Sequence, residues 1–180
     1  MEQTINLVEN FGVLVEHYRD ALYRYCFRMC RNGAMAEDMV QDTFIRAFKY
    51  RETFREGEPV KPWLYRIALN VCRTTLSRRP PVVPMMDVDA MGSRCVEHAR
   101  QMDDTRKGLE EDVTDRMAVK AALDGLSAPL REAVVLYYLE GMSVKELAET
   151  LSISESAAKV RLMRGRAALA DRLEKTRSSS

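Results

Sequence analysis

The chain has 180 residues, of which 46% are hydrophobic and 31% are charged, and its net charge at pH 7 is +1. This length allows one domain or two small ones. No apolar run approaches the ~20 residues that a membrane-spanning helix needs, and the N-terminus lacks the basic start of a secretion signal. We therefore expect a cytoplasmic protein with no stable membrane insertion.

The small net charge conceals three segments of different sign. Residues 1–79 carry 13 Lys and Arg against 10 Asp and Glu, residues 80–115 carry 4 against 9, and residues 116–180 carry 11 against 8. The acidic middle segment is rich in Asp, Glu, Met and Gly and shows no sustained apolar period, which is typical of a linker. We therefore predict two small helical domains joined by a flexible acidic linker.

Apolar residues at helical spacing predict three helices before the linker. They cover residues 11–30, 34–50 and about 62–78, and together they form a bundle with a three-helix core. The first helix is expected to end in a left-handed cap at Asn32-Gly33. The second helix is expected to bury Phe48 with the rest of its apolar side.

After the linker, the pattern predicts a four-helix unit, so the fold class is all-α. Its first two helices cover residues 116–125 and 127–140. Ser143 and Glu146 have the spacing of a capping box, so a third helix begins directly after Ser143. Ser154 is placed to cap the fourth helix. Two capped helices separated by a tight turn form a helix-turn-helix, which is a DNA-binding motif.

The last helix has an apolar face and a basic face. Its small or apolar residues recur at spacings of four, three and four, as packing requires: Ala158, Leu162, Gly165 and Leu169. The opposite side presents the candidate DNA contacts Ser156, Lys159, Val160, Arg161 and Arg164. Such a face fits the major groove, where arginine reaches phosphates and base edges. The alternative is an ordinary amphipathic helix with a solvated basic side.

A second basic surface precedes the linker. Residues 59–86 contain no acidic residue and combine positive charge with aromatic rings. The expected nucleic-acid contacts are Lys61, Trp63, Arg66, Asn70 and Arg73. Aromatic rings stack on unpaired bases while basic side chains contact phosphates, so this surface suits a single strand. The alternative for Trp63 is a place in the core of the bundle.

Cysteine and histidine spacing gives no sign of a metal site or of catalysis. Cys26 and Cys30 have helical spacing, and Cys95 lies three residues before His98, but each pair falls short of the four ligands of a structural zinc site. The two histidines lack a neighbouring nucleophile or paired acid, and there is no glycine-rich phosphate loop. We therefore predict a non-enzymatic protein with no metal and no cofactor.

Three segments together resemble a known family. They are Asp-Met-Val-Gln-Asp-Thr-Phe-Ile-Arg-Ala-Phe at 38–48, Pro-Trp-Leu-Tyr-Arg-Ile-Ala-Leu-Asn at 62–70, and the C-terminal helix-turn-helix. In combination they resemble bacterial RNA polymerase sigma factors of the extracytoplasmic-function (ECF) group of the sigma-70 family. The resemblance implies a subunit that binds core RNA polymerase, recognises the −35 and −10 promoter elements, melts the latter, and is held by an anti-sigma factor.

The resemblance also assigns roles to the predicted sites. Contact with core polymerase falls to Asp38, Gln41, Asp42 and Arg46. The surface at residues 61–73 would capture the single-stranded −10 element, and the basic face of the last helix would bind the −35 duplex. At 156–161 this chain has Ser-Ala-Ala-Lys-Val-Arg where the family often has Gly-Thr-Val-Lys-Ser-Arg. The −35 sequence is therefore not predicted.

Two other functions are compatible with the same residues. One is a transcriptional regulator whose helix-turn-helix binds duplex DNA unaided. The other is a polymerase-binding antagonist without promoter specificity.

Overall fold

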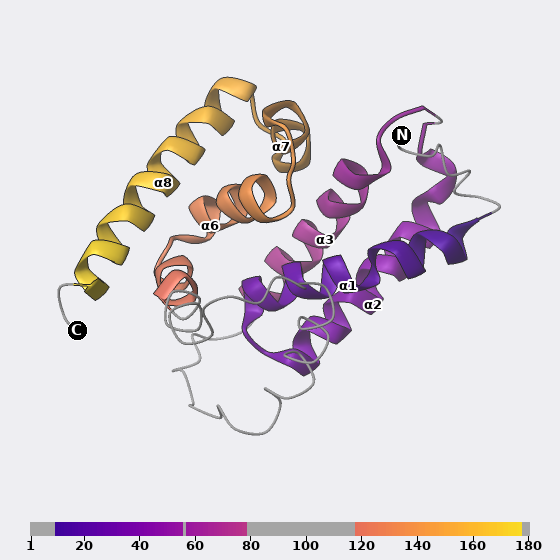
Figure 1. The fold of residues 1–180 in the computed structure, drawn as a ribbon. Helices are drawn as coiled ribbons and strands as arrows, with labels where there is room; N and C mark the ends of the chain where they lie inside the picture. Colours follow the sequence, from indigo (N-terminus) through magenta and orange to yellow (C-terminus); the bar gives the residue numbers. More distant parts are fainter. Residues whose placement is uncertain (1–9, 56, 79–117, 178–180) are drawn as a thin grey trace, which may run out of the picture.

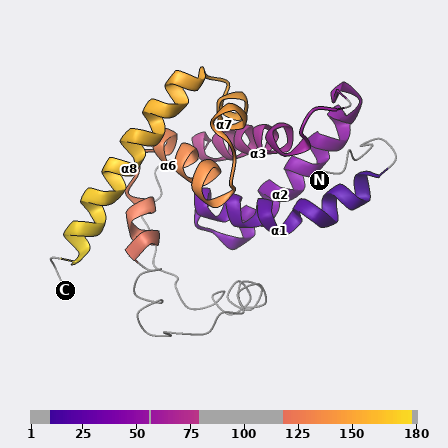
Figure 2. The same cartoon turned by 45° about the horizontal axis from the view of Figure 1, so that its top comes forward.

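The computed structural model describes residues 10–55, 57–78 and 118–177 (Figure 1). All regular secondary structure in these ranges is helical, and it forms two groups of helices that lie side by side (Figure 2). The predicted linker at 80–115 lies outside the described residues. No described helix is both long and apolar enough to cross a membrane.

The first group is the predicted three-helix bundle. It consists of α1 (Phe11–Cys30), α2 (Gly33–Tyr50) and α3 (Val60–Ser77), and each of these helices packs against the other two. A short 3-10 turn, η1 (Arg51–Thr53), follows α2. The helical spacing of apolar residues is confirmed by burial, since the largest fully buried side chains of this group are Leu14, Leu22, Tyr25, Met39, Leu64, Tyr65 and Leu69.

Two details of the bundle differ from the sequence-based prediction. The left-handed residue after α1 is Arg31, with a φ of 57°, because the Asn32 side chain instead accepts a hydrogen bond from the Met35 N–H and caps α2. Phe48 is 50% exposed. It lies near the end of α2, past the core, where its ring packs edge-on against Phe11 with centroids 5.2 Å apart.

The second group is the predicted four-helix unit. Residues 118–124 are helical, and α6 (Ala128–Val134) continues into a π-helical segment, η2 (Val135–Leu139). The helix-turn-helix comprises α7 (Val144–Leu151) and α8 (Glu155–Arg177). The π-helical segment was not predicted, because hydrophobic spacing does not distinguish it from an ordinary helical turn.

The caps of the helix-turn-helix confirm the prediction from sequence. The Ser143 hydroxyl accepts a hydrogen bond from the Glu146 N–H at 3.2 Å, and the Glu146 carboxylate accepts one from the Ser143 N–H at 2.7 Å. Ser152 makes the tight turn with a φ of 56°. The Ser154 hydroxyl then accepts from the Ala157 N–H at 3.2 Å. Each helix therefore begins at a serine whose side-chain oxygen accepts a hydrogen bond from a backbone N–H group of the first turn, which has no partner within the helix.

Two of the cysteines belong to the core of the bundle. The sulfur atoms of Cys26 and Cys72 lie 3.8 Å apart across α1 and α3, and both are buried and not joined by a disulfide bond. The hydrogen bond to Cys72, together with burial, raises the pKa of the Cys26 thiol. In the described ranges, no three His, Cys, Asp or Glu side chains gather into a group that could hold a metal. Cys95 and His98 lie outside these ranges.

The two groups of helices also pack on each other, which the sequence did not predict. Helix α3 lies against α7, and α1 touches α6. Figures 1 and 2 agree in placing α3 between its own bundle and the C-terminal unit. The buried apolar side chains form one continuous cluster that includes residues of both groups. The small domains thus share a core.

Gly165 provides a test of the packing between α6 and α8. A Cβ atom at this position would lie 2.6 Å from Cγ2 of Val134, whereas a Cβ at Gly12 in α1 would meet nothing within 4 Å. We expect Gly165→Ala to lower the midpoint of urea unfolding, because overpacking costs about 1–3 kcal/mol and outweighs a helix-propensity gain of at most about 1 kcal/mol. The control Gly12→Ala should keep or raise that midpoint. A midpoint for Gly165→Ala at or above that of the parent protein would contradict this packing.

Candidate nucleic-acid interface

The candidate duplex-binding face lies on α8. Of the four residues predicted for its buried side, Ala158, Leu162 and Gly165 are buried, whereas Leu169 is half-buried. On the other side Ser156, Lys159 and Arg164 are exposed and Arg161 is half-buried. Two apolar side chains are exposed among them, Val160 and Met163. The helix therefore presents positive charge mixed with small apolar patches, which is what phosphates, base edges and thymine methyl groups require.

The candidate single-strand surface lies on α3. Arg66, Asn70 and Arg73 are exposed along one side of this helix. Trp63 is half-buried, and its ring packs edge-on against Phe54 with centroids 5.2 Å apart. The structure therefore gives Trp63 an intermediate position between the core and solvent. The contact with Phe54 holds the indole ring in one orientation, and part of the ring stays accessible to solvent.

Three basic residues of this surface contact the C-terminal unit. The Arg73 guanidinium donates two hydrogen bonds to the Glu132 carboxylate, of 3.0 and 2.7 Å, and these bonds raise the pKa of Arg73. Lys61 donates to the backbone carbonyl of Glu140 and Arg66 to that of Glu149. The groups expected to bind DNA phosphates thus already have acceptors in this arrangement.

Glu140 forms a second polar centre between the two groups of helices. Its carboxylate accepts a hydrogen bond from the Tyr65 hydroxyl at 2.5 Å, and Arg28 from α1 lies 3.4 Å from its other oxygen. Burial, together with the neighbouring carboxylate, raises the pKa of the Tyr65 hydroxyl. Burial lowers the pKa of Arg28. One carboxylate therefore connects both α1 and α3 to the end of η2.

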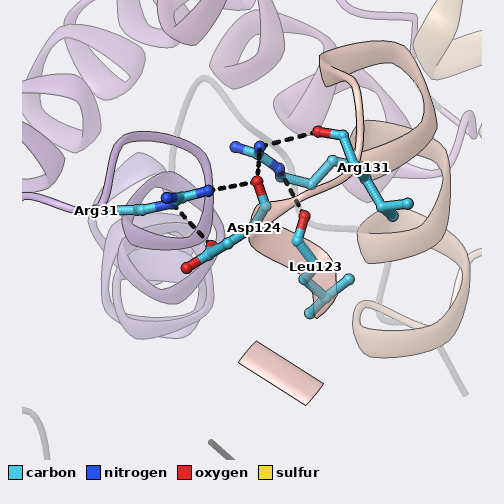
Figure 3. A network of polar contacts seen from close by, with 5 residues as sticks. Arg31, Leu123, Asp124 and Arg131 are labelled. Atoms are coloured by element: carbon cyan, nitrogen blue, oxygen red, sulfur yellow. Dashed lines mark hydrogen bonds and ion pairs between the residues drawn. The ribbon is translucent and has the colours of Figure 1, made fainter. Parts of the chain in front are cut away.

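A third polar contact joins the end of α1 to the helix at 118–124, as Figure 3 shows. Arg31 pairs with the Asp124 carboxylate at 2.8 Å and donates to the Asp124 carbonyl at 2.6 Å. From α6, Arg131 donates to the carbonyls of Leu123, Asp124 and Leu126 at 2.9–3.1 Å. Leu123 and Asp124 are the last residues of this helix, where carbonyls no longer have α-helical partners, so the two arginines cap its end.

Sequence reasoning missed Glu132 and Glu140. The signal was the run Ala-Val-Val-Leu-Tyr-Tyr-Leu at 133–139, because seven consecutive apolar residues are too many for a helix with a single buried face. Glu132 is only 5% exposed beside this run, and Val135 and Leu136 are buried. A helix buried on more than one face indicates a second packing partner, which here is the N-terminal bundle.

The candidate polymerase contact lies on α2. Asp38 and Gln41 are exposed, and Asp42 pairs with Arg46 one turn later at 2.9 Å. A surface hollow of about 570 Å³ is lined by Asp38, Gln41 and Asp42 together with Ile45, which is 65% exposed.

Comparisons with known proteins identify the family. Residues 14–80 match the family Sigma-70 region 2, and residues 116–169 match Sigma-70, region 4. The chain is 30% identical over 170 residues to the ECF RNA polymerase sigma factor SigW of Bacillus subtilis, covering 91% of this chain and 88% of SigW. The chain belongs to the ECF sigma factors.

Other ECF sigma factors and solved structures are also similar. The chain is 32% identical over 171 residues to SigE of Mycolicibacterium smegmatis, covering 93% of this chain but only 63% of SigE. It is 28% identical to CnrH, solved in complex with the cytosolic domain of CnrY, with a TM-score of 0.66 and coverage of 92% of this chain and 88% of CnrH. As an ECF sigma factor, the chain directs promoter-specific transcription initiation and is not an enzyme.

The basic face of α8 generates a prediction about salt dependence. When the logarithm of the binding constant is plotted against the logarithm of the salt concentration, each phosphate contact contributes about −0.9 to the slope. We expect Lys159→Ala with Arg161→Ala to weaken promoter binding by the holoenzyme and to reduce the slope by about 1–2. Anisotropy titrations over a salt series measure both quantities. The double control Arg19→Ala with Lys120→Ala removes equal charge elsewhere. A slope that falls no more in the α8 variant than in this control would argue against phosphate contacts by α8.

Proposed function

We propose a division of labour within this sigma factor. Residues 1–79 bind core RNA polymerase and capture the −10 strand, residues 116–180 bind the −35 duplex, and residues 80–115 connect them. One observation supports this proposal above the others. A single chain carries an exposed basic face on a capped helix-turn-helix and a separate basic and aromatic face on α3.

The −35 element is bound by the exposed side of α8. Lys159, Arg161 and Arg164 contact phosphates or base edges, while Ser156 and Val160 lie against the bases. The capped start of α8 supports this assignment, because a helix in the major groove contacts bases with its N-terminal residues.

The −10 element is captured as an unpaired strand on α3. Extruding a base costs a few kcal/mol, and stacking on an aromatic side chain returns about 1–3 kcal/mol per base. Trp63 supplies that stacking surface, Asn70 supplies amide hydrogen bonds, and Lys61, Arg66 and Arg73 bind the backbone phosphates. One or two captured bases are then sufficient to nucleate melting without ATP.

Core polymerase binds α2 through Asp38, Gln41, Asp42 and Arg46. The exposed Ile45 beside these residues supports the proposal, because a protein interface needs apolar area as well as charge. The Asp42–Arg46 pair is half-exposed, and such pairs contribute little to stability. The role proposed for this pair is therefore to offer charged groups to the polymerase rather than to stabilise the fold.

The protein works in the cytoplasm, where RNA polymerase meets the chromosome, and an anti-sigma factor holds it inactive. The solved complex of CnrH with the cytosolic domain of CnrY supports a regulatory partner for this chain. The family resemblance supports the identification of that partner as an anti-sigma factor.

Run-off transcription with purified core polymerase and a promoter library tests the proposed function. The full chain should bind core polymerase and start RNA at a defined subset of promoters. A plain regulator would instead shift duplex DNA alone, and an antagonist would bind core polymerase without producing RNA. Failure to bind core polymerase would overturn the proposal, whatever the affinity of the free chain for DNA.

The assignment of Trp63 is tested by permanganate footprinting of the −10 region. We expect Trp63→Ala to leave core binding intact and to reduce the reactivity of unpaired thymines, because the stacking surface is lost. The matched control Trp63→Tyr keeps an aromatic ring and should retain most of that reactivity. Equal reactivity in the alanine variant and the parent protein would show that another residue captures the strand.

A further inference from the structure

Three sulfur atoms meet in the core of the N-terminal bundle, one from each of its helices. The Sγ atom of Cys72 in α3 lies 3.8 Å from Sγ of Cys26 in α1 and 3.7 Å from Sδ of Met39 in α2. All three side chains are buried, and none is more than 2% exposed. The helical spacing of the sequence did not predict this group, called here the sulfur triad, because its members lie on three different helices.

The spacing of the sulfur triad suits a metal ion that the sulfur atoms share. A metal–sulfur bond is about 2.3 Å long, so two sulfur atoms 3.7–3.8 Å apart subtend about 110° at an ion that both bind. Ions with three or four ligands have angles close to this value. The core therefore places these sulfur atoms near the distances that a shared ion requires.

The chemistry of the triad favours Cu(I) over other metal ions. Soft thiolate and thioether ligands select Cu(I), whereas a structural zinc ion takes four Cys or His ligands. Within the residues that the structure describes, no three His, Cys, Asp or Glu side chains form a metal-binding group. Binding of Cu(I) would release the two thiol protons to solvent, and the thioether would bind without losing a proton. No electron is transferred, since the ion stays Cu(I).

The Tyr25 hydroxyl is an independent observation that points to a ligand beside the triad. Its oxygen is buried and has no hydrogen-bond partner among the described residues. Burial raises the pKa of this hydroxyl well above its ordinary value, and the neighbouring Cys72 adds to that shift. The group therefore stays a neutral donor. A metal-bound thiolate would give this donor an acceptor, and such outer-shell partners orient metal ligands.

Cys30 gives the ion a path from solvent to the core. Its side chain is half-buried, and it follows Cys26 by four residues on α1. Residues four apart lie on the same side of a helix, one turn from each other. An ion bound first by Cys30 would therefore reach Cys26 by exchanging one thiolate ligand for another.

We propose that Cys26, Met39 and Cys72 form a buried Cu(I) site, with the Tyr25 hydroxyl as a hydrogen-bond donor to it and Cys30 as its entrance. The ion would connect α1, α2 and α3, so its binding stabilises the folded bundle. The site goes beyond the proposed function and does not rest on it, because none of these residues is assigned to DNA or to polymerase.

The test measures Cu(I) binding by the full-length chain in anaerobic competition with the chromogenic chelator bicinchoninate, with ascorbate as reductant. Every protein carries Cys95→Ser, because this thiol outside the described residues would compete for the ion. We expect the parent chain to take up one Cu(I) and to unfold at a higher temperature when loaded. X-ray absorption should show only sulfur neighbours, at about 2.3 Å.

Three substitutions separate metal binding from core packing. Cys72→Ala should weaken Cu(I) binding by more than about 100-fold, because even outer-shell partners contribute about 10–100-fold. Met39→Leu conserves volume and so retains the fold, but it should weaken binding by about tenfold. Tyr25→Phe should also weaken binding by about tenfold. It should not lower the unfolding temperature of the metal-free chain, because it removes an unpaired buried hydroxyl.

Two control variants remove a sulfur atom outside the triad. Met29→Leu and Cys30→Ser should keep the Cu(I) affinity within about twofold of the parent chain, and Cys30→Ser should slow loading. Four results would overturn the site. They are no uptake of Cu(I) from the chelator, nitrogen or oxygen neighbours in the absorption spectrum, displacement of the ion by equimolar Zn(II), and parental affinity in Cys72→Ala or Met39→Leu.

Discussion

Each helical domain is small, which limits the apolar surface that it can bury by itself, and packing between the domains adds to that burial. A domain of about 60 residues buries only about 60% of the surface that its unfolded chain exposes. Helix α3 packs against α1 and α2 of its own bundle and also against α7 of the C-terminal unit. Tyr65 is fully buried, with its ring 5.3 Å from that of Tyr25 in the bundle and its hydroxyl on Glu140 of the C-terminal unit. The shared core therefore adds to the limited burial that each small domain achieves by itself.

The interface that results is partly polar. Contacts between domains of one chain resemble transient protein interfaces more than domain cores. Arg73, Lys61 and Arg66 all bind acceptors of the other domain, and each can exchange that acceptor for water or a phosphate. An apolar interface of the same size would offer no such exchange, because separation would expose hydrophobic surface without compensation.

The sequence predicted the local structure well because local rules determine it. The capping box at Ser143 and Glu146, the turn at Ser152 and the apolar face through Gly165 depend on residues within a few positions of one another. The relation between the domains could not be predicted in this way. Arg73 and Glu132 are 59 residues apart, and an acidic residue on a helix is ordinarily solvated. The helical spacing of the sequence placed Arg73 on a polar face of its helix but could not identify Glu132 as its partner. The assignments of DNA and polymerase contacts therefore remain proposals, whereas the helices that carry them are established.

The π-helical segment η2 fixes the direction in which Glu140 points. The Glu140 N–H bonds to the carbonyl of Val135, five residues earlier, at 3.0 Å. This wider turn accommodates one residue more than an α-helical turn, and each residue rotates a helix by about 100°. If residues 135–139 formed an ordinary α-helical turn with no change in length, the extra rotation would swing the Glu140 side chain away from Tyr65 and Arg28. The winding of the helix at this point, π-helical or α-helical, thus determines whether Glu140 joins the two halves of the chain, with no substitution in either DNA-binding helix.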